Sequence, residues 1–99
     1  MSTERILITR TEPGASKTAT LAAQRGYSPV VSPLARVEML HADVSLDAID
    51  AVALTSPNGA RAFARLTDER SLPVLAVGGA TAEAAREAGF TEITDADSD

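Results

Sequence analysis

Two turns of this chain combine hydroxyl, glycine and proline residues with the expected start of a helix. The apolar run at residues 51–54 ends at Thr55 and Ser56, and Pro57 then favours the first turn of a helix. The run at residues 73–77 leads in the same way through Gly-Gly-Ala-Thr into an alanine-rich stretch. The first backbone N–H groups of a helix have no partner within it and attract anions. The two turns therefore predict a site for a small acidic molecule.

These residues also have purely structural interpretations. Ser56 and Thr81 could cap their helices, a role worth about 1 kcal/mol for each. Asn58 could satisfy the backbone of the first turn, and Gly78 and Gly79 could serve turn geometry alone. The Gly-Gly-Ala-Thr run lacks the G-x-G-x-x-G spacing of a dinucleotide site. Capping and ligand binding use the same end of a helix, so the two interpretations are compatible.

Arg10 is the basic residue best placed to contact an anion, because it ends the first apolar run of the chain. A guanidinium at the carboxyl end of a strand could pair with a carboxylate of a ligand. It could equally form an exposed or interdomain salt bridge, and both alternatives stay open. Arg61 and Arg65 lie four residues apart and fit a solvent-facing stripe on a helix.

The composition restricts the kinds of ligand and partner. The chain has 99 residues and a formal net charge of −5, a balance that disfavours binding to the phosphate backbone of nucleic acids. It has no cysteine and one histidine, His41, so we expect neither a metal site nor a thiol nucleophile. Asp95, Asp97 and Asp99 lack the glycine and glutamate of a calcium loop, so we interpret them as an acidic tail. No signal peptide and no membrane-spanning apolar stretch is visible, which predicts a cytoplasmic protein.

Short aliphatic runs alternate with helix-like stretches, which predicts an α/β fold of parallel-sheet βα units with helices on both faces. Thr11 is expected to cap the first helix, and Gly26 and Gly89 fit the residue that follows a helix end. The expected strands are residues 5–10, 27–32, 34–40, 51–55, 74–77 and 92–94, and the expected helices are residues 15–25, 57–67 and 81–88.

Pro33 interrupts this pattern, because proline donates no ladder hydrogen bond and restrains the residue before it. We therefore predict a first βαβ unit at residues 1–33, a linking strand at residues 34–46 and the start of a second domain at residues 47–99. The second series ends on a strand and leaves sheet surface uncovered, so we expect the chain to be the N-terminal portion of a longer protein.

Four segments, in order and at matching spacing, carry a family resemblance. They are Ile6-Leu-Ile-Thr-Arg10, Gly26-Tyr27 with Pro33-Leu34, Leu54-Thr-Ser-Pro-Asn58, and Ala76-Val-Gly-Gly-Ala-Thr-Ala82. Together they resemble the N-terminal part of uroporphyrinogen-III synthase. The resemblance implies a two-domain α/β enzyme with a cleft between the domains. Such an enzyme closes the linear tetrapyrrole hydroxymethylbilane into uroporphyrinogen III, with loss of water and inversion of the last ring, and needs no metal or organic cofactor.

The resemblance also implies which residues contact the substrate. Carried over position by position, the substrate-binding residues are Thr9, Arg10, Thr55, Ser56, Asn58, Gly78 and Thr81. The region that carries the tyrosine thought to assist loss of the hydroxyl has no counterpart in this chain. The resemblance therefore implies binding of a linear tetrapyrrole without predicting turnover by this chain alone.

Two further hypotheses stay open beside the lyase. The chain could be a non-catalytic α/β module that binds an anionic ligand or a partner. It could also associate with a second copy of itself through exposed sheet edges.

Overall fold

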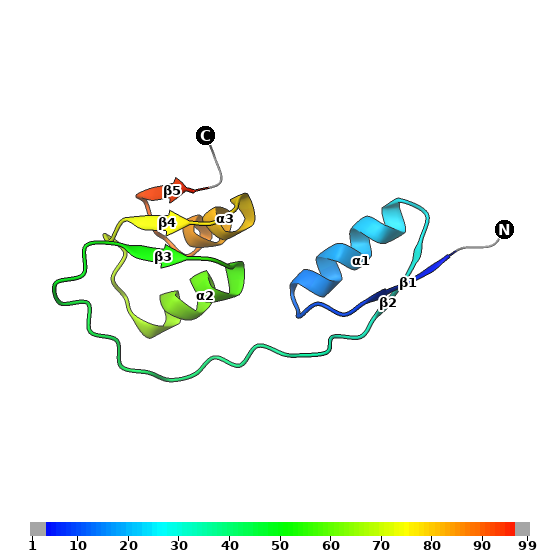
Figure 1. Ribbon diagram of the computed structural model, residues 1–99, viewed down its shortest axis with the longest axis horizontal. Coiled ribbons are helices and arrows are strands. Elements are labelled where there is room, and N and C mark those ends of the chain that lie inside the picture. The colour runs from blue at the N-terminus through cyan, green and yellow to red at the C-terminus, as the bar shows by residue number, and fades with distance from the viewer. Residues whose placement is uncertain (1–3, 97–99) are drawn as a thin grey trace. The chain divides into compact units, whose positions relative to one another are not determined.

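A computed structural model describes residues 4–96 of the chain. The chain divides into two compact units, Met1–Glu38 and Met39–Asp99, and the division falls inside the segment expected to link two domains. The first unit contains β1 (Arg5–Ile8), α1 (Gly14–Gln24) and β2 (Ser28–Val31) (Figure 1). The second contains β3 (Val52–Leu54), α2 (Pro57–Leu66), β4 (Val74–Ala76), α3 (Gly79–Glu87) and β5 (Ile93–Asp95).

The first unit is one βαβ crossover. β1 and β2 pair in parallel, with Ile6 opposite Pro29, and α1 packs against both strands. The helix ends in a Schellman motif, in which the Tyr27 N–H donates to the Ala22 carbonyl at 3.0 Å. Gly26 has a φ of 90° at this turn, a conformation that favours glycine, so the predicted helix end is confirmed.

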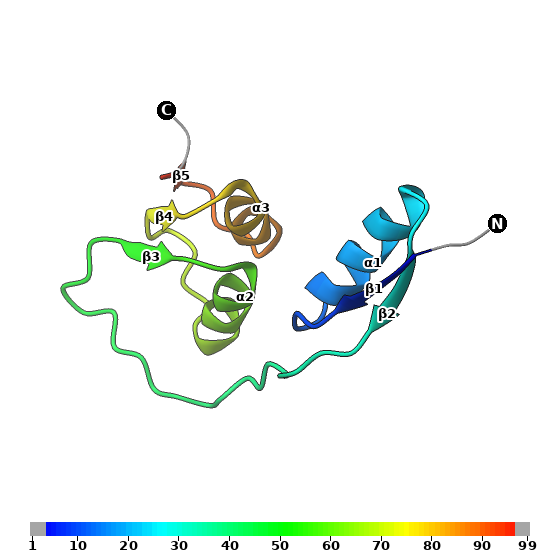
Figure 2. The ribbon, with the colours of Figure 1, turned by 45° about the vertical axis from the view of Figure 1, so that its right-hand side comes forward.

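The second unit is a three-stranded parallel sheet in the order β3-β4-β5. Figure 2 shows α2 and α3 on the same side of this sheet, where the two helices also contact each other. The prediction of parallel βα units is confirmed. Helices on both faces occur in neither sheet of the described residues. In the second unit the strands follow one another across the sheet in chain order. When successive crossovers have the same handedness and proceed in the same direction across a sheet, their helices lie on the same face.

The core of the second unit lies between its helices and its sheet. Strand residues alternate between the two faces, so Val74 and Ala76 are buried while Leu75 between them is 47% exposed on the uncovered face. Small residues let the helices approach the strands closely. The buried members of this core are Leu54, Ala60, Val74, Ala76, Ala82, Ala84, Ala85 and Phe90.

The segment between β2 and β3 is irregular. The strand expected at residues 34–40 is wrong, because no neighbouring strand pairs with this stretch and Leu34 is 81% exposed. Alternation of apolar and polar residues does not make a strand where hydrogen-bonding partners are lacking. A single turn closes the end of this segment, where the Ile49 N–H donates to the Leu46 carbonyl at 3.1 Å.

Arg70 joins the ends of the two helices of the second unit, a role that the sequence analysis missed. Its guanidinium carbon lies 5.0 Å from the centre of the Phe90 ring, in a cation–π contact. The last carbonyl groups of a helix have no partner within it, and a guanidinium can satisfy several of them. Arg70 donates to the carbonyl oxygens of Ala64, Thr67, Glu69 and Ala88 at 2.8–2.9 Å.

Candidate functional site

The two turns expected to bind an anion lie at the same edge of one sheet. β3 and β4 are parallel neighbours, so their carboxyl ends meet. The Val77 N–H donates to the Leu54 carbonyl at 3.0 Å, which ties the ends of the two strands together. The prediction that these turns share an edge is confirmed. In open α/β sheets, this edge is where ligands bind.

The turn into α2 satisfies its own backbone. Ser56 is the N-cap residue, and its Oγ accepts from the Gly59 N–H at 2.9 Å, so the capping interpretation is confirmed. Pro57 occupies the first turn, where a missing N–H is harmless. The Asn58 side chain accepts a hydrogen bond from Arg61 Nη2 at 2.7 Å. Arg61 is therefore half-buried against the start of its helix rather than part of a solvent-facing stripe.

The turn into α3 holds an acceptor supplied by the chain itself. The Gly78 N–H donates to Asp95 Oδ1 at 3.2 Å, and β5 brings this carboxylate to the start of the helix. A negative charge is favourable there because it opposes the positive end of the helix dipole. Asp95 is thus part of the sheet and not of an acidic tail; Asp97 and Asp99 lie outside the described residues.

Thr81 does not cap α3. The helix begins two residues earlier than expected, at Gly79, so the N-cap position belongs to Gly78. Gly78 has a φ of 93° and a ψ of 151°, a backbone conformation that is nearly restricted to glycine. Thr81 lies inside the first turn and is 2% exposed, so its side chain contributes to packing.

Unpaired N–H groups were the basis of the predicted anion site, and two of these groups are already hydrogen-bonded. The Gly59 and Gly78 N–H groups donate to Ser56 Oγ and to the Asp95 carboxylate. The expectation of unpaired N–H groups is therefore wrong for these two groups, because this chain supplies an acceptor for each of them. Of the five candidate residues at this edge, Thr55 and Ser56 are exposed, and both offer hydroxyl groups.

Thr9 and Arg10 belong to the first unit, where both are exposed beyond the end of β1. Arg10 Nη1 donates to Thr18 Oγ1 on α1 at 3.0 Å. Glu12 accepts from the Ser16 N–H and from Ser16 Oγ, each at 2.7 Å.

The expected cap at the start of α1 is wrong. The N-cap position belongs to Pro13, and no side chain at that position makes a capping hydrogen bond. The Glu12 carboxylate satisfies a first-turn N–H instead, while Thr11 contributes its backbone carbonyl to the Ala15 N–H at 3.0 Å. The turn into α1 therefore resembles the turn into α3, where a carboxylate also lies at a helix start.

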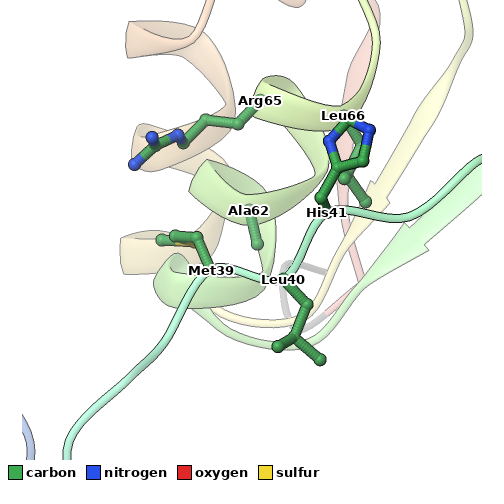
Figure 3. Close-up of a pocket in the computed structure, with 6 residues that line it drawn as sticks. All are labelled: Met39, Leu40, His41, Ala62, Arg65 and Leu66. Carbon is green, nitrogen blue, oxygen red and sulfur yellow. The ribbon is translucent and has the colours of Figure 1, made fainter.

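A shallow cavity of about 160 Å³ lies elsewhere in the second unit. Figure 3 shows it between the irregular segment and the side of α2, with the Arg65 side chain directed away from His41. None of the seven candidate residues lines it, so it is separate from the site at the sheet edge. Its lining consists of Met39, Leu40, His41, Ala62, Arg65 and Leu66.

The described residues contain no cluster of three or more histidine, cysteine or acidic side chains placed to hold a metal ion. Within residues 4–96, no helix combines the length and the apolar character that crossing a bilayer requires.

A comparison with protein-family models matches residues 16–98 to the family described as uroporphyrinogen-III synthase HemD. The chain belongs to the uroporphyrinogen-III synthase family. The match spans most of the first unit and all the elements of the second. Five candidate residues, from Thr55 to Thr81, lie inside the matched range, whereas Thr9 and Arg10 precede it. A search of curated proteins gives no match.

Proposed function

We propose that this chain serves the cyclisation of hydroxymethylbilane to uroporphyrinogen III, and that its own part is to hold the acidic side chains of the linear tetrapyrrole. The observation that supports this most directly is the shared edge of β3 and β4, where the turns that carry the family motif meet. Membership of the uroporphyrinogen-III synthase family supports the choice of substrate.

Holding the substrate is the main task of such a site. The reaction must bring the last pyrrole ring into the orientation that gives isomer III and must keep water away from a reactive intermediate. Orientation of the reacting groups and electrostatic contacts to carboxylates can supply this. The formal net charge of −5 repels a polyanion at long range, so short-range contacts must do the work. Thr55 and Ser56 would contribute hydroxyl donors and Arg10 a guanidinium.

One observation favours the alternative of a non-catalytic module that binds an anionic ligand. The sequence contains one tyrosine, Tyr27. Its backbone closes the carboxyl end of α1, where β2 begins, whereas the proposed contacts follow the ends of β1 and β3. Within the first unit, Tyr27 therefore does not lie beside Thr9 and Arg10, where it could assist loss of the hydroxyl group, which supports binding without turnover by this chain alone.

Incubation with hydroxymethylbilane, followed by separation of the oxidised products as isomers III and I, tests the lyase. Isomer III above the amount in a protein-free control supports catalysis, and isomer I alone excludes it for this chain. Titration with the octacarboxylate uroporphyrin III, followed by fluorescence, then tests binding. Thr55→Val should weaken binding while Thr94→Val, an exposed threonine of β5, should not. No saturable binding would reject both functions.

Association with a second copy also remains a proposal. In the described residues β1 and β2 each have one unpaired edge, as do β3 and β5. Pro29 in β2 lacks an N–H donor, which makes that edge less suitable for pairing. Light scattering that finds only monomer at high protein concentration would reject association through these edges.

A further inference from the structure

We propose that Gly14 and Thr18 are positioning residues for Arg10 and hold its guanidinium ready to receive a carboxylate of the ligand. The identity of that ligand rests on the proposed function, whereas the positioning itself rests on contacts within the first unit. Neither Gly14 nor Thr18 belongs to the motifs that carry the family resemblance.

Gly14 provides the space in which the guanidinium lies. A Cβ atom at this position would be 2.5 Å from Cζ, Nε and Nη2 of Arg10, a distance that a real Cβ does not tolerate. The φ of Gly14 is not positive, unlike those of Gly26, Gly78 and Gly89, so its backbone does not require glycine. Any larger residue at position 14 would therefore fill the space in which the Arg10 guanidinium lies.

Thr18 fixes the guanidinium from the next turn of α1. Residues four apart lie on the same face of a helix, so Thr18 and Gly14 contact Arg10 from one surface. The hydrogen bond from Arg10 Nη1 to Thr18 Oγ1 measures 3.0 Å. A hydroxyl group is neutral, so this contact orients the cation without cancelling its charge.

The charge of Arg10 stays available to a ligand. Within residues 4–96 the ion pairs are Arg36–Glu38 and Arg86–Glu83, and Arg10 forms none. The hydrogen bond to Thr18 uses one of the five N–H donors of the guanidinium. The remaining donors form a fork that matches the two oxygens of a carboxylate.

Glu12 is the acidic residue closest to Arg10 in the sequence, and it is engaged elsewhere. Its two carboxylate oxygens accept from the Ser16 N–H and from Ser16 Oγ. An arginine that is exposed, oriented and not neutralised is suited to bind an external carboxylate with little loss of side-chain entropy. The geometry thus assigns the ligand contact to Arg10, and the orientation of the Arg10 guanidinium to Gly14 and Thr18.

Binding of uroporphyrin III to the full chain, measured by fluorescence titration, tests the proposal through a double-mutant cycle. Arg10→Ala should weaken binding by roughly tenfold or more, as expected for a charge-assisted contact. Gly14→Ala and Thr18→Val should each weaken it by about 3- to 10-fold in the natural chain and not at all in the Arg10→Ala background. Equal losses in both backgrounds would overturn the proposal.

Two comparisons separate positioning from a general loss of structure. Thr18→Ser keeps the hydroxyl group and should bind uroporphyrin III as tightly as the natural chain does. Thr20→Val is the matched control on the same helix, because the Thr20 hydroxyl donates to the Ser16 carbonyl at 3.1 Å and does not contact Arg10. Gly14→Ala should not lower the melting temperature, since alanine favours a helix more than glycine does. A loss of binding in Thr20→Val as large as that in Thr18→Val would contradict the positioning role.

A measurement without ligand distinguishes this proposal from the proposed function. The NMR signal of the Arg10 Nε–H group should report a rigid side chain in the natural chain and a mobile one in Gly14→Ala and Thr18→Val. An equally mobile side chain in all three would overturn the positioning role even if uroporphyrin binds. If the natural chain binds no uroporphyrin while these signals change as expected, the proposed function fails and the positioning role stands.

Discussion

The two units of this chain differ in how much of each is buried. The second unit has a core of eight buried apolar residues, from Leu54 to Phe90. Among the described residues of the first unit, the buried apolar ones are Ile8 and Ala15. A three-stranded sheet with two helices on one face shields its strand residues, whereas a two-stranded sheet with one helix leaves Leu7 63% exposed. The second unit therefore has the means to hold its turns rigidly, and the first depends more on individual side-chain contacts.

The turns of the two units differ in the groups that they expose for a ligand to contact. In the second unit, Ser56 and Asp95 each accept from one N–H group at the start of a helix, and the hydroxyl groups of Thr55 and Ser56 remain exposed. In the first unit, the Glu12 carboxylate accepts from an N–H group at the start of α1. The Arg10 guanidinium is not neutralised and remains exposed. We therefore expect the turn of the first unit to recognise a ligand by charge and the turns of the second unit to recognise one by hydrogen bonding.

Phe90→Ala should have the largest effect and should separate the stabilities of the units. Phe90 is 3% exposed and stacks on Phe63 with a ring-centre distance of 5.9 Å. Its truncation should cost about 3–5 kcal/mol of unfolding free energy, because it leaves a cavity in the larger core. Denaturant unfolding measures this loss, and amide hydrogen exchange should locate it in the second unit. Leu75→Ala, on the uncovered face, should change stability by less than about 0.5 kcal/mol.

The exchange data also test the comparison itself. If Phe90→Ala accelerates exchange in α1 as much as in α3, the two units unfold together and the contrast between their cores has no consequence.

Arg70→Ala should have the next largest effect, about 2–3 kcal/mol. The substitution leaves carbonyl groups at the ends of both helices of the second unit without their donor and removes the contact with the Phe90 ring. Arg36→Ala is the matched control, because its ion pair with Glu38 is exposed and worth about 0–1 kcal/mol. Similar losses of stability in the two variants, measured by thermal unfolding, would show that Arg70 does not join the helices.

Asp95→Asn should have a smaller effect, about 0.5–1 kcal/mol, because it keeps an acceptor for the Gly78 N–H and removes the charge at the start of α3. Asp95→Ala removes both and should cost more. Amide exchange at Gly78 follows the hydrogen bond directly. Faster exchange in the alanine variant alone would show that the acceptor matters more than the charge.

Ser71→Ala should have the smallest effect on stability, because it alters an exposed turn of the second unit. The Ser71 side chain and the Ser71 N–H donate to the Glu69 carboxylate, which lowers the pKa of Glu69 from its ordinary value of 4.5. A lowered pKa means that this contact stabilises the fold at neutral pH and that the contribution is lost as the pH falls through the lowered pKa. Carboxyl NMR titration should show the pKa of Glu69 rising in Ser71→Ala. An unchanged pKa would mean that the hydroxyl contributes nothing.

Much of the fold could be predicted because its signals are local. Aliphatic runs predicted the strands β1, β3 and β4, and Gly26 and Gly89 marked helix ends because their backbone φ values are positive. Pro57 and Ser56 marked the start of α2 within a single turn of chain. The strand that was wrongly expected shows the limit of such signals. The alternating residues 34–40 have a strand pattern, but a strand also needs a partner, which a local pattern does not reveal.

Local patterns along the chain were enough to predict the alternation of strands and helices, most helix ends and the position of two turns at one sheet edge. Which groups bind at those turns could be seen only once the chain was folded. Asp95 reaches Gly78 across 17 residues, Arg70 reaches Ala88 across 18, and Arg10 occupies the space that Gly14 leaves. The first two contacts depend on where the packed backbone carries groups that are distant in the sequence, and the third depends on how the turn before α1 folds back onto the helix.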